Sequence, residues 1–293
     1  MQPAMPSSVG VWATAWGEAL LEDAELLRTA YQLNNRSPLG SAAGFGVPVP
    51  IDRTLTAKLL GFNGLCHNVL HASNARGKME AVILDALGAV MLTLSRLAQD
   101  LMLYTLPEFG YFSIPKEFGT GSSIMPNKNN PDVLELVRGK TAGVLAAGDR
   151  IKGLIKAAPG GYNRDIQEAK EPFMEGLAVT RHTLRIMTRH IEGLTIHKDR
   201  LLAGFEPGVF ATDKALEMVA DGTPFRDAYH YVKDHLHELD TADPYAALKA
   251  KTHEGATAGL DFAAYRSQVR DLKKWTRSEK SKEARIRNAL LPL

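Results

Sequence analysis

The fold is decided by residues 76–105, which read RGKMEAVILDALGAVMLTLSRLAQDLMLYT. Apolar residues recur there at steps near three and four, a spacing that places them on one face of a helix: Met79, Ile83, Val90, Leu94, Leu97, Leu101 and Tyr104. The positions between them are also largely apolar, and charge from Met79 onward is limited to Glu80, Asp85, Arg96 and Asp100. This pattern predicts one long helix that is covered on most of its sides.

Three further stretches show the same helical spacing. They are residues 9–33, residues 133–157, and a stripe through Phe173, Leu177, Leu184, Met187 and Ile191. Long helices that are apolar on several faces are typical of a bundle, and their surplus apolar surface predicts contacts between subunits. Shorter helical patterns follow over residues 210–221, 224–238 and 243–252. We therefore predict an all-α fold, with a long-helix bundle over residues 1–195 and a smaller C-terminal helical domain with a charged tail over residues 196–293.

The composition permits a sizeable core and argues against several classes of function. Hydrophobic residues make up 45% of the 293 positions, and the net charge of +2 gives no case for a nucleic-acid partner. Cys66 is the only cysteine, which excludes a disulfide within the chain and indicates a reducing compartment. No uncharged apolar stretch reaches the roughly 18 residues that a membrane span needs. The first residues lack the basic and apolar regions of a secretory signal, so we expect a cytoplasmic protein.

Residues 121–131 hold the most informative set of polar side chains. They read Gly-Ser-Ser-Ile-Met-Pro-Asn-Lys-Asn-Asn-Pro, and their glycine-rich start predicts a mobile loop that closes over a ligand. Asn130 suits the N-cap of a following helix, and Pro131 suits its first position. Lys128 would then lie just ahead of a helix N-terminus, where its charge and the helix dipole both favour an anion. The run therefore predicts a site for carboxylates.

This run resembles the signature of the fumarase and aspartase superfamily of lyases, Gly-Ser-Ser-x-Met-Pro-x-Lys-x-Asn-Pro, at every fixed position. Residues 162–172, Tyr-Asn-Arg-Asp-Ile-Gln-Glu-Ala-Lys-Glu-Pro, are similar to the corresponding segment of argininosuccinate lyases. Residues 131–139 and 50–53 resemble the same subfamily. The resemblance extends from Met1 to about residue 230, and it implies the all-helical fold of that superfamily, with four chains in a tetrameric bundle.

The resemblance also implies a reaction and the residues that perform it. In this family a serine of the mobile loop removes a proton beside a carboxylate, and the substituent on the neighbouring carbon leaves. Ser122 matches that serine, and Lys128 and Asn130 match the residues that hold the carboxylate as negative charge builds. Glu135 matches an acidic residue that pairs with a catalytic histidine of another subunit.

A set of substrate-binding residues is implied in the same way: Asn68, Arg76, Ser123, Asn130, Tyr162, Gln167 and Lys170. The segment around Arg76 departs from the family, because His71, Asn74 and Gly77 stand where we expect aspartates. The electrostatics of this edge of the site should therefore differ. His67 and His71 have the i, i+4 spacing of a metal pair, but no third ligand accompanies them, so we expect neither a metal nor a cofactor.

Residues 1–6 resemble the end of a second family segment, Thr-His-x-Gln-x-Ala-x-Pro, whose histidine position would precede Met1. In the family this histidine is the general acid, and a whole domain precedes it. We therefore expect a chain that supplies the serine, lysine and glutamate of a site but not the acid. Its partners would be further copies in a homotetramer, or a complementing N-terminal polypeptide.

The implied activity is cleavage of L-argininosuccinate to L-arginine and fumarate, without a cofactor. Two alternatives remain. A sister lyase acting on another succinyl compound, such as adenylosuccinate, shares the serine-loop signature. A non-catalytic structural or regulatory protein on a lyase scaffold would fit the expected absence of the acid. The charged stretch 273–287 has more basic than acidic residues and is interpreted as a solvated helix or a frayed tail.

Overall fold

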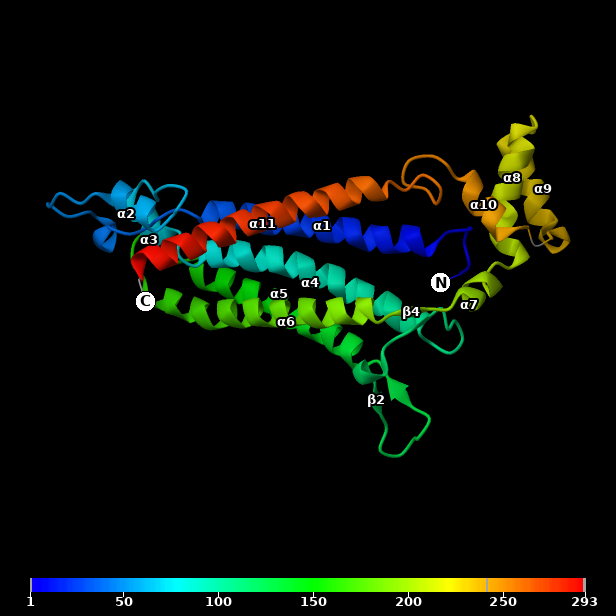
Figure 1. The fold of residues 1–293 in the computed structure, drawn as a ribbon, viewed down its shortest axis with the longest axis horizontal. Helices are drawn as coiled ribbons and strands as arrows, with labels where there is room; N and C mark the ends of the chain where they lie inside the picture. The colour runs from blue at the N-terminus through cyan, green and yellow to red at the C-terminus, as the bar shows by residue number, and fades with distance from the viewer. Residues whose placement is uncertain (1, 241, 292–293) are drawn as a thin grey trace. The chain divides into compact units, whose positions relative to one another are not determined.

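A computed structural model describes residues 2–240 and 242–291, in which α-helices dominate (Figure 1). The long helices are α1 (Val9–Asn34), α4 (Lys78–Tyr104), α5 (Asp132–Ile155), α6 (Lys170–Glu192) and α11 (Phe262–Leu290). The shorter α-helices are α2 (Arg53–Leu59), α3 (Val69–Asn74), α7 (Lys198–Ala203), α8 (Ala211–Ala220), α9 (Phe225–Asp234) and α10 (Pro244–Ala250). The predicted all-α fold and each of the predicted long helices are confirmed.

Two-residue strands and 3₁₀ turns connect these helices. Strand β1 (Phe112–Ser113) pairs antiparallel with β4 (Thr195–Ile196), and β2 (Thr120–Gly121) pairs antiparallel with β3 (Asn129–Asn130). The 3₁₀ turns cover Ala42–Gly44, Lys116–Phe118, Arg164–Ala169, Pro207–Phe210 and Leu236–Glu238. Strands β2 and β3 lie at the two ends of the signature loop and hold these ends together.

The chain divides into two compact units, the larger of which contains residues 19–102, 115–193 and 266–293. In this unit α5 packs along α6, and the Thr141 hydroxyl of α5 donates to the backbone carbonyl of Met91 in α4 at 3.1 Å. The Thr93 hydroxyl of α4 donates to the Asp23 carboxylate of α1 at 2.7 Å. These bonds join neighbouring helices of a bundle through polar groups that would otherwise be buried without partners.

The core of this unit lies along α4, as the sequence predicted. Leu84, Met91 and Leu101 are almost fully buried, and so are Leu134 and Ile151 of α5. Close helix contact depends on small residues, because a Cβ at Gly176 of α6 would meet the Leu84 side chain at 2.5 Å. Helix α4 is apolar and long enough to match a membrane span, but 56% of that window is buried inside the protein, as in a core helix.

The smaller unit contains residues 1–18, 103–114 and 194–265. Helices α8 and α9 pack together in it around Ala215, Ala228 and Val232. A second cluster is aromatic, because the Trp12 ring lies 5.2 Å from Phe112 and 6.1 Å from Tyr104, measured between centroids. The division into domains at residue 195 stays a prediction. The basic stretch 273–287 forms part of α11 and belongs to the larger unit.

Candidate active site

The signature loop stands on a short hairpin stem. Thr120 pairs with Asn130 and Gly121 with Asn129 in the β2–β3 ladder, and the Thr120 hydroxyl donates to the Asp132 carboxylate. The predicted helix start after this loop is confirmed, but its cap differs. Pro131 takes the N-cap position, and Asn130 makes no capping hydrogen bond because its backbone belongs to the ladder.

Between the two strands, the loop folds back on Ser122. The Ser122 Oγ accepts hydrogen bonds from the backbone N–H groups of Ile124 at 3.3 Å and Met125 at 3.1 Å. The tip is open to solvent, with the Ile124 side chain 86% exposed. Ser123 and Lys128 are also exposed. The loop thus presents its polar groups outward from a fixed stem.

Glu135 lies in the first turn of α5, a few residues after the loop. It is exposed and lines a shallow hollow of about 500 Å³ together with Asp132, Leu136 and Lys140. Glu135 is therefore open to solvent at the start of α5, and its pairing with a histidine of another subunit stays a prediction.

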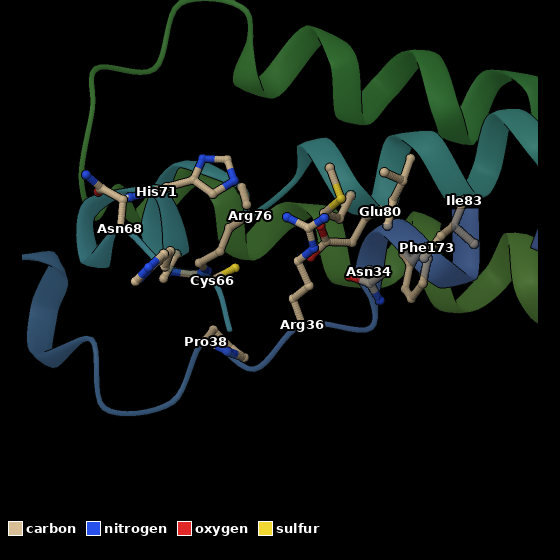
Figure 2. A pocket seen from close by; sticks show the side chains of 15 residues that line it. Asn34, Arg36, Pro38, Cys66, Asn68, His71, Arg76, Glu80, Ile83 and Phe173 are labelled. Atoms are coloured by element: carbon tan, nitrogen blue, oxygen red, sulfur yellow. The ribbon is translucent and has the colours of Figure 1, made fainter. Parts of the chain in front are cut away.

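A larger cavity, of about 550 Å³, lies between the segment after α1, helix α3 and the start of α4 (Figure 2). Asn68 and Arg76 both line it. The Asn68 Oδ1 caps α3 by accepting from the N–H groups of Leu70 and His71, both at 2.9 Å. The Arg76 guanidinium lies over the Tyr162 ring, 5.3 Å from its centroid. Asn68 therefore stabilises the start of α3. The fold also brings Arg76 and Tyr162 together.

The segment that carries Tyr162, Gln167 and Lys170 is anchored to α3 by one of the residues that depart from the family. The Gly161 N–H donates to the Asn74 Oδ1 at 2.7 Å. Gln167 lies in the 3₁₀ turn that follows, and exposed Lys170 is the first residue of α6. Asn74 thus positions the turn that carries Tyr162.

The predicted site residues fall into two groups at opposite ends of α5. Glu135 is in the first turn of this helix, whereas its last residue, Ile155, packs beside Gly77, next to Arg76. At a rise of 1.5 Å per residue, the ends of this stretch are about 30 Å apart. A single chain therefore does not bring Ser122, Lys128 and Glu135 together with Arg76, Tyr162 and Lys170.

Sequence reasoning missed a histidine at the base of the signature loop. His190 of α6 is fully buried, and both ring nitrogens lack a hydrogen-bond partner within the described residues. Its ring stacks on Phe118 at 4.9 Å between centroids, directly before the loop. Burial lowers the pKa of His190. The sequence offered no signal for this pair, because His190 lies seventy residues or so from Phe118 and matches no motif.

No cluster of three or more His, Cys, Asp or Glu residues suited to a metal is found in residues 2–240 and 242–291. His67 and His71 both line the cavity.

Comparison with known proteins shows which proteins the chain is similar to. The protein family described as "Lyase" matches residues 1–146. The argininosuccinate lyase of Sorangium cellulosum is 42% identical over 260 residues, which cover 89% of this chain and 60% of that protein. The argininosuccinate lyase of Xanthomonas campestris (strain B100) is 40% identical over 272 residues, which cover 92% and 62%. This chain thus spans about 60% of the length of these relatives.

Solved structures show the same fold at lower sequence identity. An EDDS lyase in complex with formate superposes with a TM-score of 0.88 at 23% identity, over 98% of this chain and 65% of that one. A class II fumarase from Schistosoma mansoni superposes with a TM-score of 0.66 at 15% identity, over 87% and 61%. The complete signature loop and these relatives make the chain similar to argininosuccinate lyases, and the helical bundle gives it the all-α fold of the EDDS lyase and the fumarase.

Proposed function

We propose that this protein is an argininosuccinate lyase-like enzyme, which cleaves L-argininosuccinate to L-arginine and fumarate in arginine biosynthesis. The observation that carries the proposal is identity of about 40% to argininosuccinate lyases across most of the chain, combined with an intact signature loop. We place it in the cytoplasm, with a small-molecule substrate and no cofactor.

The proposed base is Ser122. A neutral serine is a weak base, so it must act as an alkoxide, whose negative charge needs hydrogen-bond donors. The N–H groups of Ile124 and Met125 already point at the Ser122 Oγ, and the cation of Lys128 belongs to the same loop. These groups favour the oxyanion of Ser122 over its neutral hydroxyl, and the oxyanion is the state that removes a proton.

The elimination then proceeds through charge on a carboxylate. Ser122 takes the proton from the carbon beside one carboxylate of the succinyl group, and the electron pair moves onto that carboxylate. Lys128 and Asn130 stabilise the charge by an ion pair and a hydrogen bond. A double bond forms as the carbon–nitrogen bond breaks, and the departing guanidino nitrogen takes up a proton. Glu135 would orient the imidazole that supplies this proton.

The two groups of site residues lie about 30 Å apart in one chain, so we propose that each site combines residues of different copies in a homotetramer. Ser123, Lys128 and Asn130 would come with Ser122 from one copy. Asn68, Arg76, Tyr162, Gln167 and Lys170 would come from another. A complementing N-terminal polypeptide is the alternative partner.

The test is fumarate formation by a complete enzyme that contains this chain and the histidine-bearing segment, followed through the ultraviolet absorbance of the new double bond. Ser122→Ala should nearly abolish the rate, whereas Ser281→Ala, an exposed serine on α11, should leave it unchanged. A Ser122→Ala rate within about threefold of the wild type would exclude Ser122 as the base.

The same assay compares argininosuccinate with adenylosuccinate. Faster turnover of adenylosuccinate would assign the protein to the sister lyases. Absence of turnover on both substrates by the complete enzyme would favour the non-catalytic alternative.

A further inference from the structure

The cavity at the start of α4 contains more positive than negative charge. Two guanidinium groups, Arg36 and Arg76, line it, and Glu80 is the one acidic residue among its described lining. Figure 2 shows the Arg36 side chain extending from the segment after α1 toward the start of α4, where Glu80 lies. The remaining surface is largely apolar, with Met79, Ile83 and Phe173.

Neither arginine forms an ion pair with a carboxylate of the described residues. Within residues 2–240 and 242–291, no carboxylate oxygen lies within 4.0 Å of a guanidinium nitrogen of Arg36 or Arg76. The Arg76 guanidinium lies over the ring of Tyr162 instead. Stacking on an aromatic ring leaves the N–H groups in the plane of the guanidinium available for a planar anion.

The backbone on both sides of Arg36 is pinned. The Asn63 N–H donates to the carbonyl of Asn35 at 3.2 Å, and the Ser37 N–H donates to the carbonyl of Gly64 at 2.8 Å. The Cys66 N–H in turn donates to the Ser37 carbonyl at 2.9 Å. Arg36 thus starts from a fixed position, which reduces the ordering cost of binding a ligand.

A third arginine shows that the wall of the cavity is preformed. Arg53 donates to three backbone carbonyls, those of Leu39 at 2.9 Å, Cys66 at 2.8 Å and His67 at 3.2 Å. It therefore ties the segment that follows Arg36 to the segment that precedes Asn68. Since all three bonds go to the backbone, Arg53 stabilises the wall of the cavity. The ligand would then contact the other two arginines.

We propose that this cavity binds the zwitterionic end of an α-amino acid, with Arg36 and Arg76 on its carboxylate and Glu80 on its ammonium group. Guanidinium groups suit a planar carboxylate, and the apolar side chains suit the methylenes of the amino acid. The inference deepens the proposed function and rests on it in one respect: the natural ligand would be the arginine half of the substrate. Arg36 is then a specificity-determining residue that no motif assigned.

Isothermal titration calorimetry with two probes tests this. L-Arginine and agmatine share the guanidinium and the methylenes, but agmatine lacks the carboxylate. The wild type should bind L-arginine about tenfold or more tightly than agmatine, because charge-assisted hydrogen bonds to the carboxylate are lost. Arg36→Gln should weaken L-arginine binding by a similar factor and leave agmatine unchanged, while Arg36→Lys should restore part of the difference.

Arg28→Gln is the matched control, since Arg28 lies on α1 outside the cavity and pairs with Glu25 at 2.6 Å. Circular dichroism of each variant checks that it is folded. Equal affinity of the wild type for the two probes, absence of L-arginine binding, or unchanged L-arginine binding in folded Arg36→Gln would each overturn the inference. Fumarate formation by the complete enzyme distinguishes this failure from failure of the proposed function. Turnover without Arg36-dependent binding refutes only the cavity, and Arg36-dependent binding without turnover in the complete enzyme refutes only the lyase.

Discussion

Two variants that are each inactive should restore activity when they are mixed. Ser122 lies on the loop before α5, and Lys170 lies beyond the other end of this helix, so a distance of about 30 Å separates them in one chain. If each site draws Ser122 from one copy and Lys170 from another, Ser122→Ala chains and Lys170→Gln chains complement each other. The experiment is therefore to assemble these two variants together in equal amounts.

The expected rate of the mixed assembly follows from random association of the two variants. A site is intact when its serine comes from a Lys170→Gln chain and its lysine comes from a Ser122→Ala chain. Each condition holds with probability one half, so about a quarter of the sites of a closed symmetric assembly are intact. Fumarate formation should then reach about a quarter of the wild-type rate, provided the intact sites act independently.

A second mixture separates this arrangement from a site made by one chain. The double variant Ser122→Ala/Lys170→Gln, co-assembled with an equal amount of wild type, should give about a quarter of the wild-type rate if the residues come from different copies. It should give about half if they come from the same copy. A rate near one half here, together with no gain from mixing the single variants, would refute the divided site.

Two further predictions concern residues whose tasks the structure defines. Because burial lowers the pKa of His190 below its ordinary value of 6.5, the unfolded chain takes up a proton below that pH and the folded chain does not. The free energy of unfolding, measured with urea, should therefore fall as the pH drops below about 6.5, by at most about 1.4 kcal/mol per pH unit from this group. His190→Leu should remove that contribution. An equal dependence of the free energy of unfolding on pH in both proteins would contradict this prediction. Asn68→Ala should lower the free energy of unfolding by about 1 kcal/mol through loss of the α3 cap, and Asn68→Asp should largely keep it. Equal stability of all three proteins in urea unfolding would show that the cap contributes nothing.

The long helices were predictable because their apolar spacing is a local property. Helix α4 was expected over residues 76–105 and spans Lys78–Tyr104, since eleven of its residues are buried and they recur along the whole helix. The cap of α5 was not predictable in the same way. Asn130 has a strong preference for N-caps, but pairing with Thr120 takes its backbone into a ladder that propensity does not report.

The candidate site was predictable only as far as it follows a motif. Ser122, Lys128 and Glu135 are close in sequence and lie on one loop and the turn after it. Arg36 lines the same cavity as Arg76, and His190 stacks on Phe118 at the base of the loop; both pairs join segments that are distant in sequence. Such pairs arise from tertiary packing, and neither the periodicity nor the composition of one segment records them.

The exposed surface of α5 and α6 supports the divided site independently of the motif. Leu136 of α5 is 59% exposed and Met174 of α6 is 63% exposed, and Leu145, Leu184 and Ile191 on the same two helices are exposed as well. Large exposed apolar side chains that gather on packed helices favour a face that another chain covers. Helix α5 also carries Glu135 at its first turn and ends beside the Arg76 group. If further copies pack along α5 and α6, as we propose, the same contact that buries these side chains can bring the loop of one copy to the cavity end of another. The exposed apolar faces and the incomplete site of the single chain then have one physical explanation.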